Sequence, residues 1–155
     1  MKKRNGLRTV ALLLATVLLL GLLSGCASSG VRKVISKFEK ACQELDADTM
    51  LDCLNPTITN PLGDVLDFFG VDSLNSALSG VVKVLGVIDF KDDAPEDVLK
   101  TLKIKCKGFD FNDAKDACTV TAQLSYTVDG EKVEKTVLIK CEQVDDAWYI
   151  MSFGS

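Results

Sequence analysis

The sequence predicts an α+β domain in which N-terminal helices cover one face of an antiparallel sheet of about four strands. Three observations support this fold class. Apolar residues recur at helical spacing from residue 31 to about residue 54. From about residue 102 to the end of the chain they alternate with polar residues, and short turns rich in Asp, Asn and Gly separate the alternating segments. Helices followed by an antiparallel meander is the order typical of α+β domains.

The first 25 residues have the pattern of a secretory signal. They contain four basic residues and no acidic residue, and an uncharged run from Thr9 to Gly25 has an apolar core of 14 residues, Val10 to Leu23. A membrane-spanning helix needs about 20 apolar residues. The run therefore favours a removable leader over a permanent span.

The end of this run, Leu23-Ser24-Gly25-Cys26, resembles the lipobox of bacterial lipoproteins. In that family the cysteine thiol receives a diacylglycerol and the chain is cut just before the cysteine. The resemblance implies that Cys26 is the lipid attachment site and that the protein is anchored on the extracytoplasmic face of the cell membrane, since two acyl chains suffice for stable anchoring. The alternative is a plain secreted protein with Cys26 near an ordinary cleavage site.

This interpretation divides the chain into three parts. Residues 1–25 are expected to be the signal peptide, residues 26–30 a short tether, and residues 31–155 a single domain. A tether of about five residues reaches at most about 17 Å. We therefore expect the domain to stay close to the membrane.

Loss of the leader makes the domain strongly acidic. The whole chain has 18 basic and 22 acidic residues. Removal of the four basic residues of the leader leaves 14 basic residues against 22 acidic ones, a net charge of −8. Such a charge argues against nucleic-acid binding and against electrostatic adhesion to an anionic bilayer. The chain has no histidine, which excludes histidine-based acid–base catalysis and histidine-ligated metals.

The helical part begins with one long apolar stripe. Ser29 or Gly30 can cap the first helix, and Asp48 can cap a short second helix that ends at Asn55-Pro56. Residues 57–93 are the least clear: helical repeats are favoured there, but residues 84–88 fit a strand equally well. A further short helix begins near Pro95. The stripe of the first helix consists of Val31, Val34, Ile35, Phe38, Ala41, Cys42 and Leu45.

The meander has one hairpin whose register follows from the sequence. If Asp129-Gly130 is a two-residue turn, residues whose numbers sum to 259 face each other, and Cys118 faces Cys141. At a hydrogen-bonded site their Cα atoms lie about 5.5 Å apart, within the usual range for a disulfide. Two alternatives remain open, a disulfide and two small buried hydrophobic side chains.

Three segments resemble small lipoproteins whose mature part is a nuclear-transport-factor-2-like (cystatin-like) domain. They are the opening helix "VISKFEKACQELDADTMLDCLNP", the hairpin "CTVTAQLSYTVDGEKVEKTVLIKC" and the terminal "DDAWYIMSF". The resemblance covers about residues 31–56 and 101–153. It implies a curved sheet wrapped on the first helix, often with a pocket. It implies no single activity, because this fold hosts isomerases, binding modules and inert partners.

The cysteines that remain after acylation of Cys26 are odd in number, so they cannot all pair within one chain. Cys42 and Cys53 lie on neighbouring helices and could pair or simply pack. Cys106 shares the apolar face with Cys118, but zinc is disfavoured because the chain has neither histidine nor a Cys-x-x-Cys motif.

The remaining polar patterns each have a structural explanation beside a functional one. Lys103, Lys105 and Lys107 could bind an anion, but they are typical of residues that protect an edge strand. The acidic segment 110–116 has some calcium-loop residues but lacks a glycine and a glutamate at the required positions, which favours a solvated turn.

Tyr126 and Trp148 are the residues most able to line a pocket for a flat apolar ligand, although aromatic residues at strand spacing are also typical of a core. The polar residues on the apolar face are mainly Lys135 and Ser152, which do not form a converging set. We therefore expect a non-catalytic binding or interaction module, with a small apolar ligand or an envelope protein as partner and with no catalytic residue, cofactor or metal. The alternatives are a small isomerase or hydrolase with a carboxylate or tyrosine in the pocket, and a purely structural envelope component.

Overall fold

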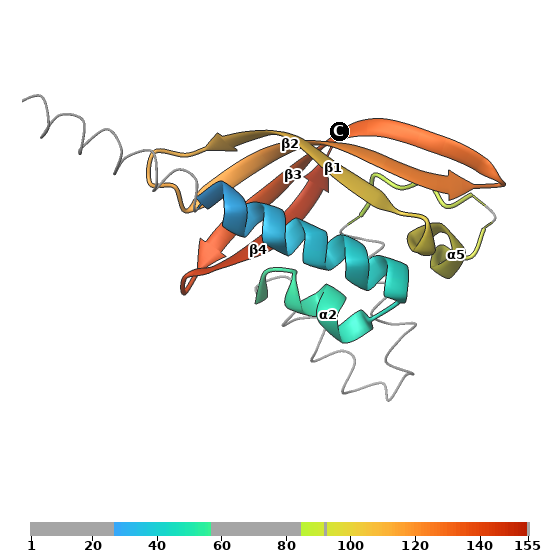
Figure 1. Ribbon diagram of the computed structural model, residues 1–155, viewed down its shortest axis with the longest axis horizontal. Helices are drawn as coiled ribbons and strands as arrows, with labels where there is room; N and C mark the ends of the chain where they lie inside the picture. The colour runs from blue at the N-terminus through green and yellow to red at the C-terminus, as the bar shows by residue number, and fades with distance from the viewer. Residues whose placement is uncertain (1–26, 57–84, 92, 155) are drawn as a thin grey trace, which may run out of the picture.

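The computed structural model describes residues 27–56, 85–91 and 93–154 (Figure 1). The chain is helical over residues 27–44, which we call the long helix. The predicted signal peptide, Cys26 and the predicted helices between residues 57 and 84 lie outside the described residues. The other elements are α2 (Ala47–Asp52), α5 (Pro95–Lys100), β1 (Lys103–Phe111), β2 (Ala117–Val128), β3 (Glu131–Val144) and β4 (Ala147–Gly154).

The four strands form one antiparallel sheet in the order β1-β2-β3-β4, as the alternating pattern predicts. The register predicted for the β2–β3 hairpin is confirmed along its whole length, with Val128 opposite Glu131 and Cys118 opposite Cys141. Asp129 and Gly130 have φ angles of 53° and 74°. Positive φ at both turn residues gives a turn whose twist matches that of the strands, which explains why this two-residue turn sets the register.

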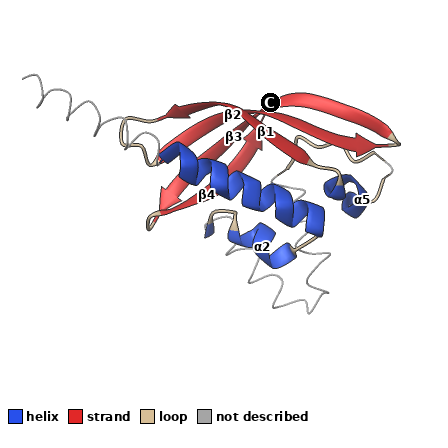
Figure 2. Ribbon diagram, in the orientation of Figure 1, coloured by secondary structure: helices blue, strands red, loops and turns tan. Residues whose placement is uncertain are grey.

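The helices lie on one side of the curved sheet, and the core fills the space between the two layers (Figure 2). The apolar stripe of the long helix is buried against the sheet. Phe38, with none of its surface exposed, meets Phe153 of β4 with ring centroids 5.8 Å apart. Inward-facing residues of β2 alternate with exposed or half-buried ones, as expected for a sheet with one covered face. The predicted α+β fold is therefore confirmed.

Both edges of the sheet are partly covered by residues from the helical region. On the β1 edge, the Ile104 amide donates to Glu39 Oε2 at 2.9 Å, and Gln43 Nε2 donates to the Leu102 carbonyl at 2.6 Å. On the β4 edge, the Ile150 amide donates to the Cys53 carbonyl at 2.8 Å, and the Asn55 amide donates to the Ile150 carbonyl at 3.0 Å. Leu54 thereby forms a short parallel bridge with Ile150.

The structure differs from the sequence-based predictions at the start of the domain. Residues 27–30, predicted as part of a flexible tether, are helical, so Ser29 and Gly30 lie within the long helix and do not cap it. The physical reason is tertiary: Gly30 lies against the indole of Trp148, and a Cβ at this position would come within 2.6 Å of Trp148 Cδ1. Only a glycine lets the helix pass this close to the ring.

Two further local predictions need correction. The side chain of Asp46, not Asp48, caps α2 by accepting from the Thr49 amide at 3.1 Å. Residues 85–88, which fitted helix or strand, form a turn in which the Ile88 amide donates to the Leu85 carbonyl at 2.7 Å. The predicted start of α5 at Pro95 is confirmed.

Candidate binding groove

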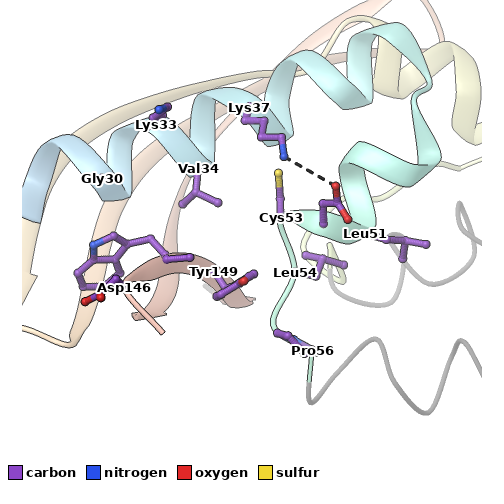
Figure 3. A pocket seen from close by; sticks show the side chains of 13 residues that line it. Gly30, Lys33, Val34, Lys37, Leu51, Cys53, Leu54, Pro56, Asp146 and Tyr149 are labelled. Carbon is purple, nitrogen blue, oxygen red and sulfur yellow. Dashed lines mark ion pairs between the residues drawn. The ribbon is translucent and has the colours of Figure 1, made fainter. Parts of the chain in front are cut away.

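An open groove of about 740 Å³ lies between the long helix, the end of α2 with the segment that follows it, and the first residues of β4 (Figure 3). The long helix forms one wall and the chain from Leu51 to Pro56 forms another. The β3–β4 turn and the start of β4 complete it. Its lining residues are Gly30, Lys33, Val34, Lys37, Leu51, Asp52, Cys53, Leu54, Pro56, Asp146, Ala147, Trp148 and Tyr149.

Trp148 is the largest side chain in the groove and the only tryptophan of the chain. Its ring packs edge-on against Phe111, with centroids 5.9 Å apart and an interplanar angle of 77°. One edge of the indole lies against Gly30, and the residue remains half-buried. The ring is therefore held by the fold on two sides while part of it stays accessible. Trp148 therefore lies in the wall of the groove.

Tyr126, the second residue expected to line a pocket, lies in the core instead. Only 2% of its surface is exposed. The Lys135 ammonium lies 5.7 Å from the centre of its ring, and the same ammonium donates to the Val87 carbonyl. Trp148 and Tyr126 share a sheet face, but residues 85–102 help to cover the end of the sheet that carries Tyr126. The two aromatic residues therefore do not form one site.

The charged residues of the groove lie on opposing walls. Lys37 Nζ on the long helix is 3.9 Å from Asp52 Oδ2, and both side chains are more than half exposed, so this pair contributes little to stability. Lys33 lies one helical turn earlier on the same wall, and no ion pair joins it to another residue of the described ranges. Asp146 lines the groove from the β3–β4 turn, where it is exposed.

The two thiols nearest the groove are buried and protonated. Cys53 lines the groove but has only 1% of its surface exposed, and burial raises its pKa to about 11. Burial, together with a smaller contribution from the neighbouring Cys53, raises the pKa of Cys42 to about 12. A reactive cysteine needs thiolate character, which these environments oppose. The groove therefore offers no activated thiol.

Cys118 and Cys141 face each other on β2 and β3, as the sequence predicts. Both are free thiols in the structure, and so are the other three described cysteines. Burial raises the pKa of Cys141 to about 12 and raises that of Cys118 as well. The disulfide itself stays a prediction. Among the described residues, no group of three or more Cys, Asp or Glu side chains is arranged to hold a metal ion.

The two remaining polar patterns lie on β1 and in the turn that follows it. Lys103, Lys105 and Lys107 are exposed on β1, which is an edge strand. In the acidic turn, Asn112 Nδ2 donates to Asp116 Oδ1 at 2.6 Å, and Asn112 Oδ1 accepts from the Asp116 amide at 3.1 Å. These hydrogen bonds hold the turn between β1 and β2.

Sequence reasoning did not single out Lys33, Lys37, Asp52 and Asp146. The one available signal was the spacing of Lys33 and Lys37, four residues apart beside the apolar stripe of the long helix. The acidic residues come from α2 and from the β3–β4 turn, which meet the helix only after folding. Their arrangement around one groove had no signal in the sequence.

Comparison with known proteins supports the fold. No protein-family model matches the chain, and a search of curated proteins finds no significant similarity. Among solved structures, the chain is similar to an NTF-2-like protein of unknown function from Shewanella oneidensis MR-1, with a TM-score of 0.53 and 14% sequence identity. The similarity covers 81% of this chain and 95% of that protein.

The helices of the described ranges are too short or too polar to cross a membrane. Together, the helices packed on one face of a curved four-stranded meander and the similarity to a solved structure show that this chain has an NTF-2-like α+β fold.

Proposed function

We propose that the protein is a lipoprotein anchored through Cys26 on the extracytoplasmic face of the cell membrane, and that it acts there as a non-catalytic binding module. The groove beside Trp148 is the proposed binding site. The position of this groove carries the proposal. Gly30 in its wall is only four residues from Cys26, so the groove lies at most about 14 Å from the lipid attachment point.

The chemistry of the groove favours binding over catalysis. Its lining combines an accessible aromatic ring with aliphatic side chains and exposed charges, which is typical of a recognition surface. Among the residues that the structure describes, the carboxyl groups with shifted pKa values are Asp46 and Glu134, and both lie outside the groove. Hydrogen bonds from Thr49 and Lys132, respectively, lower these pKa values, whereas a general acid near neutral pH needs a raised value.

The alternative function is a small isomerase or hydrolase that uses a carboxylate or a tyrosine in the pocket. Asp52, Asp146 and Tyr149 are the groove residues of those types, and Asp52 lies beside Lys37 in an ion pair. The two functions differ in what a substitution does. Asp146→Asn and Tyr149→Phe would abolish turnover in an enzyme, whereas in a binding module each changes affinity only modestly.

Membrane fractionation of the full chain expressed in a bacterial host tests the anchor. Wild-type protein is expected in the membrane fraction, and Cys26→Ala is expected in the soluble fraction or as uncleaved precursor without incorporated labelled fatty acid. Cys106→Ala is the matched control, because it removes a thiol far from the leader and should remain acylated. Equal labelling of wild type and Cys26→Ala would refute the anchor.

A further inference from the structure

Within the described ranges, the outer edge of β4 is only partly used for hydrogen bonding. The amide and carbonyl of Ile150 both point away from β3, because they bond to Cys53 and Asn55. Peptide groups two residues apart in a strand face the same side, and β4 has no bulge between Trp148 and Ile150. The amide and carbonyl of Trp148 therefore also point away from β3.

The β3–β4 turn leads to the same conclusion. Val144 faces Ala147 across the two-residue turn Asp145-Asp146, so these two residues form the hydrogen-bonded pair next to the turn. The next pair, which contains Trp148, is then a pair without mutual hydrogen bonds. Among the described residues, no backbone hydrogen bond to the outer side of Trp148 is present.

The groove lies where the short parallel strand beside β4 stops. Cys53 and Asn55 bond to Ile150, but the preceding residues belong to α2 and leave the sheet. A continued strand would place residue 52 beside Trp148. Instead, this space is the groove, with Gly30 and Val34 on its helical wall (Figure 3).

We propose that the groove binds an extended peptide segment of another protein, which adds to the edge of β4 as a strand beside Trp148. This inference rests on the proposed binding function and names the class of partner. Addition of a strand to an exposed sheet edge is a general mode of peptide recognition, in which backbone bonds give affinity and alternate side chains give specificity. The amide and carbonyl of Trp148 supply the two backbone bonds.

The dimensions of the groove fit a short strand. Its helical wall runs from Gly30 to Lys37, seven residues that rise about 10 Å along the helix. Three residues of a strand span about 10 Å. The bound segment is therefore about three residues long in the groove, with its neighbours exposed on either side.

The walls define the chemistry of the bound segment. Its inward side chain meets the Trp148 ring and Val34, which favours an apolar residue there. Lys33 lies at the rim without an ion-pair partner among the described residues and favours a carboxylate next to that apolar residue. The preferred segment is thus an apolar residue in an extended strand, with Asp or Glu on the side that faces Lys33.

The test uses full-length protein in lipid nanodiscs and a display library of random nine-residue peptides. Enriched peptides are synthesised, and their binding is followed by the fluorescence of Trp148, the only tryptophan of the chain. Each peptide is also made in two N-methylated versions, or phases. One version carries N-methyl groups at the odd-numbered residues and the other at the even-numbered residues. One phase is expected to lose at least tenfold in affinity and the other to bind nearly as well, because only every second amide of an edge strand faces β4.

Protein variants locate the site. Lys33→Glu should weaken peptides with an acidic flank by at least threefold, whereas Lys100→Glu, an exposed lysine outside the groove, should not. Leu51→Arg, which places a long side chain in the groove, should weaken every selected peptide. Circular dichroism confirms that each variant is folded.

Three outcomes would overturn the inference: no enriched peptide, equal affinity in both methylation phases, or binding unaffected by Leu51→Arg. If no peptide is enriched and vesicles of phosphatidylglycerol and phosphatidylcholine shift the Trp148 emission, the groove is a lipid site. In that case the peptide inference fails while the proposed binding function stands. Failure of acylation at Cys26, in contrast, would refute the anchor and leave the peptide result intact.

Discussion

Replacement of Gly30 by alanine tests the contact that holds the long helix against Trp148. Alanine is the better helix former, and the substitution in an open helix position would stabilise the protein by about 1 kcal/mol. Here the added Cβ would lie 2.6 Å from Trp148 Cδ1 and 2.9 Å from Nε1. Both distances are shorter than real carbon contacts, so the indole or the helix must move.

The two effects have opposite signs, and their magnitudes decide the outcome. Overpacking of a well-packed site costs typically 1–3 kcal/mol. Trp148 cannot turn away freely, because Phe111 packs edge-on against it at 5.9 Å. We therefore expect Gly30→Ala to lower the free energy of unfolding by about 1 kcal/mol, since a cost of about 2 kcal/mol exceeds the helical gain.

Urea denaturation followed by circular dichroism measures this difference, and acrylamide quenching of Trp148 measures its displacement. Gly108→Ala is the control, because a Cβ there meets only Thr121 Cβ at 3.9 Å, an ordinary contact. Quenching should increase in Gly30→Ala and stay unchanged in Gly108→Ala. A more stable Gly30→Ala protein with unchanged quenching would refute the proposed close contact.

Two further predictions concern the β3–β4 turn and the buried thiols. Asp146 has a φ of 65°, a conformation that glycine adopts at no steric cost. Asp146→Gly should therefore raise the free energy of unfolding, measured by thermal or urea denaturation, by about 0.5–1 kcal/mol. A lower free energy of unfolding in this variant would contradict the turn geometry. Burial raises the pKa of Cys42 and Cys141 to about 12 from 9.0, so these thiols keep their protons in the folded state while the unfolded chain loses them above pH 9. The protonated buried thiols therefore make their full contribution to the free energy of unfolding below pH 9. This contribution falls by about 1 kcal/mol per thiol by pH 10. Urea denaturation at pH 8 and pH 10 measures this loss, and Cys42→Ala should reduce it; equal pH dependence in both proteins would contradict the assignment.

The register of the β2–β3 hairpin could be predicted from local sequence alone. Asp129-Gly130 is a turn signal that needs no tertiary information, and one turn of known length fixes every pair between β2 and β3. The same reasoning placed Cys118 opposite Cys141. The apolar stripe of the long helix was equally readable, because helical spacing depends only on neighbouring residues.

The helical conformation of residues 27–30 could not be predicted from local sequence. Ala27-Ser28-Ser29-Gly30 has the composition of a linker, and glycine is a poor helix former. Helix formation there accompanies the packing of Gly30 on Trp148, a residue 118 positions later in the chain. Local propensity carries no information about such a distant contact.

The sequence alone determined the α+β class, the four-stranded meander and the burial of one face of each element, because these follow from the spacing of apolar residues and from turn chemistry. Only the tertiary structure decided that Tyr126 is core while Trp148 lines a groove. Both have the same strand spacing on the same face. Their difference arises because residues 85–91 and 93–102 help to cover one end of the sheet, whereas the described residues Gly30 and 53–56 border a groove at the other end beside β4.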